Sequence, residues 1–461
     1  MSRKQMRHSS LQEESAKEER EDRLSSLPED LCKHILCMLP IQDAIRTCIL
    51  SKKWRYTYQS LQNLVFDSSQ FTDAESRPDH FVEFIDQLLL HHDDSDIPVI
   101  KFKLWSEIAR YKLKTKWIDF ALKHNVEDLV IEARVAEPKG FSPCIFSSTT
   151  LKRFTFVVGF YILKRPTSVY LPSLKELRLG GVIFIDGDLT RELFSSCPML
   201  EYVHLLNCDM FRLKVLTVSA LRLKYFHIDY CRGLQTIEMN LHTPSLISLI
   251  WRGNLAQIYH IRGGPSVHYA DIQVGDIYRS QTSIDVLSQT TFNLLNELCR
   301  VTVLAVDNLF LELLFYKASS PWIYANAITF HNLSNVYMSV WPSKKHIQMI
   351  VILLSRMPNV HSAHFLMLAQ GHPSHASALE WNAENLETIG MPNLLEYIYV
   401  DKFVGHEIDL YLVKVFLENA KSLVKLTIST CCNDIDGKKP EIIEKLMALP
   451  RASTNVEVLL L

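Results

Sequence analysis

The sequence predicts an α/β protein in which a group of short helices precedes a curved solenoid of parallel strands plus helices, closed by an α+β segment. Three observations predict this arrangement. Short amphipathic helical patterns crowd into residues 22–67, a motif of three apolar residues recurs along most of the remaining chain, and the last segment alternates helical and strand patterns. With 461 residues, 48% of them apolar, the chain is long enough for two or three domains.

Composition excludes several classes of protein. Residues 1–20 mix charges of both signs and contain few apolar side chains, so we expect a disordered tail. The net charge of −2 argues against a nucleic-acid partner, and the lack of a long apolar run argues against a membrane. Ten cysteines without a C-x-x-C pair, and no signal-type segment, indicate reduced thiols in a soluble intracellular protein.

The N-terminal helices form one short group. The first is expected to begin at Pro28 and to end before Pro40, with one apolar face formed by Leu31, Ile35, Leu36 and Leu39. The second brings together Ile41, Ala44, Ile45 and Cys48, and Ser51 is expected to cap a basic third helix over residues 52–55. Because helices this short bury too little surface alone, some of their apolar surface requires a partner.

A repeat follows this group. A helix over residues 79–90 ending in a polar loop at 91–96, a strand over 97–105 and a helix over 114–124 are expected first. The pattern apolar-x-x-apolar-x-apolar then begins at Val126, Leu151, Leu174 and Leu200, which are 25, 23 and 26 residues apart. This spacing lies in the window of about 20–29 residues typical of leucine-rich repeats. Each copy predicts a strand whose second and third apolar residues point inward, and stacked copies expose a concave face.

Further copies begin at Leu213, Leu223 and Leu246. The later copies, which begin at Val301, Leu333, Val360, Leu395 and Leu423, are looser, and a degenerate copy begins at Val267. The register between about residues 252 and 332 is not fixed by the spacing, and Gly263-Gly264 indicates a turn there. A helix over 410–420, a strand over 423–429, a helix starting near Pro440 and a strand over 456–461 are expected to cap the open core.

Three sets of residues resemble one plant family. "LPEDLCKHILCMLPIQDAIRTCILSKKWR" resembles the F-box motif, in which Leu-Pro opens the first helix and Ser-Lys-x-Trp-Arg closes the motif. "LPSLKELRLGGVIF" and "SSCPMLEYVHLLNC" resemble the family's leucine-rich repeats, although residues 265–320 match no repeat cleanly. "LLEYIYVDKFVGHEIDLYLVKVFLENAKSLVKLTIS" and "LMALPRASTNVEV" resemble its FBD domain. The resemblance implies an F-box at 21–67, a repeat solenoid at 68–380 and an FBD cap at 381–461.

The resemblance also implies a function. The chain would be the substrate-recognition subunit of an SCF-type ubiquitin ligase, docking on a Skp adaptor and through it on cullin, and binding an unknown protein target. It would be non-catalytic, without a cofactor, in the nucleus and/or cytoplasm. Expected adaptor contacts are Leu27, Pro28, Ile35, Leu36, Leu39 and Trp54. The alternative is a repeat scaffold outside ubiquitination, with the helices packed on the repeats, and a small molecule that assists target binding is left open.

Catalytic and metal-binding patterns are weak. Cys231 beside Arg232 is the nearest candidate for a reactive cysteine, but it ends a repeat strand, where small residues pack. His361-x-x-His364 with His372-x-x-His375 has paired spacing, yet it lacks a cysteine and begins at a repeat strand, so no metal site is expected. Residues 433–437 are interpreted as a loop, not as a calcium site.

Overall fold

The computed structural model describes residues 26–71, 78–93, 98–106, 113–133, 143–164, 166, 168–262, 267–275, 283–316, 328–368, 390–430 and 439–461. The chain divides into two compact units, residues 1–159 and residues 160–461. Several predictions lie outside the described residues: the tail at 1–20, the Gly263-Gly264 turn, the pair His372 and His375, and the loop at 433–437.

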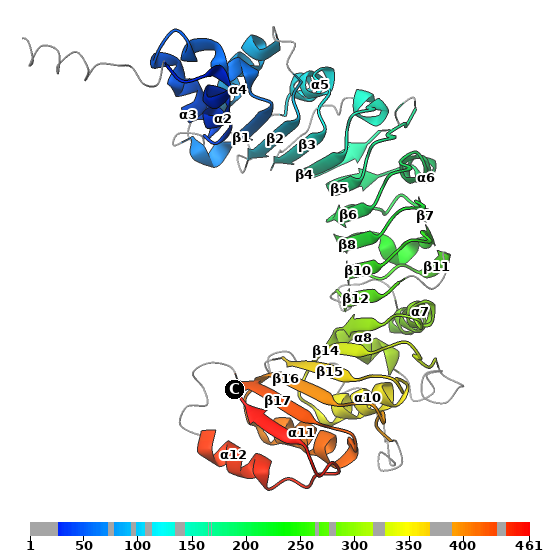
Figure 1. Cartoon of the computed structure of the whole chain (residues 1–461). Helices are drawn as coiled ribbons and strands as arrows, with labels where there is room; N and C mark the ends of the chain where they lie inside the picture. Colours follow the sequence, from blue (N-terminus) through cyan, green and yellow to red (C-terminus); the bar gives the residue numbers. More distant parts are fainter. Residues whose placement is uncertain are drawn as a thin grey trace, which may run out of the picture. The chain divides into compact units, whose positions relative to one another are not determined.

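The first unit begins with the predicted helical group (Figure 1). It contains α2 (Glu29–Cys37), α3 (Ile41–Arg46) and the 3-10 helices η1 (Thr47–Ile49) and η2 (Trp54–Ser60). Pro28 and Pro40 are the N-cap residues of α2 and α3. The third helix differs from its prediction, because it is a 3-10 helix that starts at Trp54 and Ser51 does not cap it. Ser51 instead accepts the Arg55 backbone N–H through its carbonyl at 3.1 Å.

Four parallel strands follow in the order of the chain: β1 (Asn63–Asp67), β2 (Lys101–Ser106), β3 (Asp128–Ala133) and β4 (Arg153–Leu163), the last of which ends in the second unit. β1 was not predicted. The remaining elements are η3 (Ser68–Gln70), α4 (Pro78–Asp93), α5 (Thr115–Lys123) and η4 (Pro143–Ser147).

The prediction that a polar loop begins at residue 91 is wrong, because α4 continues to Asp93. His92 is buried, and its Nε2 lies 2.9 Å from the Leu61 carbonyl oxygen.

The second unit is built on a parallel sheet. In spatial order its strands are β5 (Glu176–Phe184), β6 (Tyr202–Leu206), β8 (Tyr225–Cys231), β10 (Ser248–Gly253), β12 (Tyr269–Val274), β13 (Val303–Val306), β14 (Asn335–Val340), β15 (Ser362–Met367), β16 (Tyr397–Phe403), β17 (Lys425–Thr430) and β18 (Glu457–Leu460). The predicted repeat strands are therefore confirmed, including the degenerate copy, where Ala270 pairs with Leu304. The second and third apolar positions of the motif form the core, as Val203 and Leu205 do at 0% exposure.

One predicted repeat strand lies elsewhere. β7 (Val215–Ser219), which contains the motif beginning at Leu213, pairs with β9 (Glu238–His242) in a second, three-stranded sheet that also contains β11 (Ile258–Arg262). Leu213 and Leu223 are only ten residues apart, so both motifs belong to one repeat. Of the two strands in this repeat, β8 belongs to the main sheet and β7 belongs to the three-stranded sheet.

The second unit also contains helices (Figure 1). They are η5 (Leu234–Thr236), α6 (Gly187–Ser195), α7 (Ile284–Glu297), α8 (Asn308–Leu314), α10 (Lys344–Ser355), α11 (Glu407–Asn419) and α12 (Lys439–Met447). Asp186, Ser283 and Ser343 cap three of them by accepting backbone N–H groups. The expected alternation of α11, β17, α12 and β18 is confirmed, whereas a domain boundary at residue 381 stays a prediction. Among the described helices, none has the length and apolar character needed to span a membrane.

Asp307 makes the stability of the second unit depend on pH. It caps α8 by accepting the Phe310 N–H at 2.9 Å, and burial raises the pKa of its carboxyl to about 7. Between about pH 4 and 7 the folded chain keeps a proton that the unfolded chain releases, so stability falls as pH rises through this window. Asp307→Asn is expected to keep the cap and to raise the free energy of unfolding by about 1–3 kcal/mol more at pH 8 than at pH 5. Urea denaturation at both pH values measures this, and equal effects at both would contradict it.

Candidate functional site

Apolar side chains are exposed on the N-terminal helices. Met38 is 71% and Ile49 87% exposed, and four others are between 36% and 49% exposed. They lie on α2 and in the segments that follow α2 and α3. We call them the helical apolar surface: Leu31, Ile35, Met38, Leu39, Ile49 and Leu50. Exposed aliphatic groups concentrated in one short stretch favour binding of another protein.

The six predicted contact residues divide between surface and interior. Ile35 and Leu39 are 36% and 37% exposed, Pro28 is exposed, and Leu27 is half-buried. Leu36 and Trp54 are each 1% exposed, so in the free chain they present almost no surface to an adaptor. Consecutive helical residues point about 100° apart, which turns Ile35 outward while Leu36 packs inside. An adaptor contact by the exposed members stays a prediction.

The buried members hold the helices together. Leu36 and Trp54 share the interior with Cys32, Ile41 and Ala44, all at most 5% exposed. The carbonyl of Leu27 accepts hydrogen bonds from the Lys53 ammonium and, at 3.8 Å, from the Cys32 thiol. These hydrogen bonds connect the end of the helical group at Lys53 to its start at Leu27. The exposed side chains are therefore held on a rigid backbone.

A second surface lies on the main sheet of the second unit. In each repeat strand, the residue between the two inward apolar side chains points to the opposite face. Neighbouring strands are paired so that these residues form one row, which we call the central row of the sheet face: Arg178, His204, His227, Ile250, Asp271, Ala305, Tyr337, His364, Tyr399 and Thr427. The predicted in-out alternation is confirmed along this row.

Two family models match the chain in the places where these surfaces lie. Residues 24–62 match the F-box domain, and residues 115–312 match the leucine-rich repeats of the FBD-associated F-box protein At5g56370. The chain carries an F-box and leucine-rich repeats. The helical apolar surface lies on the F-box, and the central row up to Ala305 lies within the matched repeats.

Relatives in Arabidopsis thaliana extend the similarity to most of the chain. The FBD-associated F-box proteins At5g22730 and At1g66310 are 26% and 28% identical to it, over 95% of this chain and 94% and 96% of their own lengths. The F-box/FBD/LRR-repeat protein At1g51370 is 26% identical over 96% of both chains. The resemblance to plant F-box proteins with leucine-rich repeats and an FBD domain is therefore confirmed.

The first part of the central row forms a hydrogen-bonded network with Asp229 and Arg252, which lie two residues further along β8 and β10. Arg178 Nε donates to His204 Nδ1 at 3.0 Å, which leaves His204 Nε2 to donate to Asp229 at 2.8 Å. On the next strands Arg252 donates to Asp271 at 3.1 Å. The two arginines and two aspartates compensate one another's charge, so β5 to β12 present a polar surface with fixed side chains.

The second part of the row is aromatic. His364 stacks between Tyr337 and Tyr399, with ring centroids 4.4 and 4.2 Å apart and interplanar angles of 19° and 7°. Burial lowers the pKa of His364, as it does for His204 and His227, which favours their neutral form at pH 7. Tyr337 on β14 and Tyr397 on β16 are 40% and 37% exposed. Rings with polar edges are residue types enriched in protein interfaces in general.

Sequence reasoning missed Met38, Ile49 and Leu50 as surface residues. Met38 lies beyond the last turn of α2, and Ile49 lies in η1, where the period of an α-helix no longer applies. The available signal was that Ile49 and Leu50 extend an apolar run just before the polar segment Ser51–Lys53.

The candidate reactive cysteine and the candidate histidine metal ligands do not form a catalytic or metal site within the described residues. Burial raises the pKa of the Cys231 thiol, which lies 3.5 Å from the Leu205 carbonyl, so it lacks the character of a reactive thiolate. His361 is exposed, whereas His364 belongs to the aromatic stack. Within the described ranges, no three His, Cys, Asp or Glu side chains are grouped as metal ligands. The eight described cysteines are free thiols.

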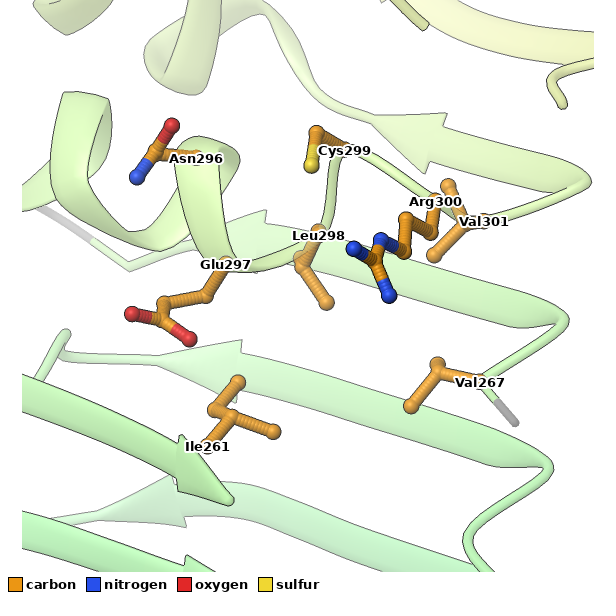
Figure 2. A pocket seen from close by; sticks show the side chains of 8 residues that line it. All are labelled: Ile261, Val267, Asn296, Glu297, Leu298, Cys299, Arg300 and Val301. Carbon is orange, nitrogen blue, oxygen red and sulfur yellow. The ribbon is translucent and has the colours of Figure 1, made fainter. Parts of the chain in front are cut away.

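Among the cavities lined by described residues, two lie outside these surfaces. One of about 220 Å³ follows the end of α7 and is lined by Ile261, Val267 and residues 296–301 (Figure 2). It is smaller than the roughly 300–1,000 Å³ of typical ligand pockets. The other, of about 640 Å³, lies in the first unit between the F-box helices and α4, and its lining includes Ile45, Tyr58 and Phe84.

Proposed function

We propose that the chain is the substrate-recognition subunit of an SCF-type ubiquitin ligase, in which the F-box docks on a Skp adaptor and through it on cullin. The observation that carries the proposal is the helical apolar surface on a matched F-box domain. Large exposed side chains such as Ile49 and Met38 are suited to anchor positions in a protein interface. Their support by buried Trp54 and Leu36 fixes the geometry that such an interface needs.

The repeats have a separate role in this proposal. The sheet face of the second unit binds a protein target through the polar network of β5 to β12 and the aromatic stack of β14 to β16. The chain performs no covalent chemistry. It raises the effective concentration of target lysines near the ubiquitin-carrying enzyme, which is catalysis by proximity. The site of action is the nucleus and/or cytoplasm, where free thiols such as those described persist.

Co-expression of the full chain with a Skp adaptor and cullin tests the proposal. A stable ternary complex is expected in size-exclusion chromatography, with cullin retained only when the adaptor is present. A wild-type chain that is folded by circular dichroism and binds no adaptor would contradict the proposal and favour a binding scaffold outside ubiquitination.

A further inference from the structure

Tyr230 has a backbone conformation that its residue type rarely adopts. Its φ is +53°, in the left-handed region, where bulky residues are strained. At about the same level on the neighbouring strands, the residues with positive φ are Gly181 within β5, Asn207 directly after β6 and Gly253 at the end of β10, with φ of 67°, 50° and 111°. Glycine and asparagine are the residue types that this conformation favours. Tyr230 is the exception among the four, and its side chain is 58% exposed.

The strand ends around Tyr230 are tightly interlocked. A Cβ atom on Gly253 would lie 3.0 Å from the Tyr230 Cα, and one on Gly233 would lie 2.4 Å from the Phe211 backbone nitrogen. Arg232 forms a parallel bridge with Asp209, whose carboxylate accepts the Phe211 N–H at 3.1 Å. The backbone therefore fixes Tyr230 and Phe211 in place, and both rings are held out toward solvent.

Exposed aromatic side chains lie on the segments around Arg232. Phe160, Phe211 and Tyr230 are 61%, 57% and 58% exposed, and the Arg232 guanidinium lies 5.9 Å from the centre of the Phe160 ring. We call Phe160, Phe211, Tyr230 and Arg232 the strand-end aromatic patch. Arg212, next to Phe211, is also exposed. Aromatic rings with arginines at their side are the residue types that dominate protein interfaces.

The chain itself does not offset the strain at Tyr230. A buried ring would compensate an unfavourable backbone by removing apolar surface from water, but this ring is more than half exposed. Asparagine at the same position would satisfy the backbone at lower cost. A binding partner that covers the Tyr230 ring would bury its apolar surface and so offset the backbone strain. Binding therefore explains why a tyrosine occupies this position.

We propose that the strand-end aromatic patch binds an acidic segment of the protein target that carries apolar side chains. The apolar side chains of this segment pack on the rings of Phe211, Tyr230 and Phe160. Its carboxylates pair with two exposed arginines, Arg232 at the Phe160 ring and Arg212 next to Phe211 in the chain. The patch lies at the strand ends and is distinct from the central row of the sheet face. The identification of the partner as the target rests on the proposed function.

Selection of a phage library of random short peptides on the full chain tests the patch. Selected peptides are expected to be rich in Asp and Glu together with Leu, Phe or Trp. Their affinity, measured by fluorescence polarisation with labelled copies, is expected to fall about tenfold or more in Tyr230→Asn and in Arg232→Ala. Tyr170→Asn is the matched control, since Tyr170 is also 58% exposed but precedes β5, and it is expected to bind as the wild type does.

A second measurement separates binding from folding. Tyr230→Asn is expected to unfold at the same or a higher temperature than the wild type, because asparagine suits the left-handed backbone. A lower unfolding temperature would make Tyr230 structural and overturn the proposal. Peptides without acidic enrichment, peptides that bind Tyr230→Asn equally well, or self-association of the chain that this variant abolishes, would also overturn it. Adaptor binding is measured on the same preparations, so a chain that selects acidic peptides but binds no adaptor contradicts only the proposed ligase function.

Discussion

Replacing Met38 and Ile49 together by glutamate is expected to weaken adaptor binding by about a hundredfold or more. Both side chains are largely exposed, at 71% and 87%, so the free chain loses little packing when they change. In a complex they would be covered, and two buried carboxylates without partners cost several kcal/mol. Titration calorimetry of the full chain with a purified Skp adaptor measures the change.

The control for this experiment is Leu221→Glu. Leu221 is 63% exposed, on the second unit, and is expected to tolerate the charge with unchanged adaptor affinity. The double variant Leu27→Ala with Pro28→Ala tests two of the other predicted adaptor contacts. Leu27 is half-buried and Pro28 is the N-cap residue of α2, so both lie at the start of the F-box helices. If Met38→Glu with Ile49→Glu binds the adaptor as tightly as the Leu221 variant does, the helical apolar surface is not the docking surface.

The repeat strands could be predicted because the same spacing recurs and each strand buries alternate residues. Even the degenerate copy at Val267 occupies its expected place in the sheet as β12. β7 could not be placed, because its motif is as regular as its neighbours and only the pairing with β9 assigns it to a second sheet. The polar residues around His92 predict a loop, and the buried contact of its ring with the Leu61 carbonyl leaves no pattern in the sequence.

The candidate surfaces were predictable only in part. The order of the central row follows from the repeat, but the bond from Arg178 to His204 requires the strand register, which joins residues 26 apart. Which members of the F-box are exposed depends on how three short helices turn against one another. A sequence pattern marks Leu36 and Trp54 as apolar, and only their packing shows that both are interior. The left-handed backbone of Tyr230 has no signal in its residue type, which argues against that conformation.

Trp54→Ala is expected to lower the free energy of unfolding of the F-box helices by about 3–5 kcal/mol. Trp54 is 1% exposed and is among the largest fully buried side chains of the chain. Its removal leaves a cavity beneath α2 and α3 that short helices cannot close without rearranging. Because two units need not unfold together, amide hydrogen exchange resolved by residue is the suitable measurement. Faster exchange is expected at residues 29–46, with β5 to β18 unchanged.

This variant also separates a supporting residue from a contact residue. If Trp54 acts by supporting the exposed side chains, adaptor affinity falls together with the exchange protection of α2 and α3. Trp54→Phe, which keeps most of the apolar volume, then restores both to a similar extent. If Trp54 instead contacts the adaptor directly, Trp54→Ala keeps the protection of α2 and α3 while binding is lost. The burial of Trp54 favours the first outcome, because a side chain that the chain already covers has almost no surface left to give to a partner.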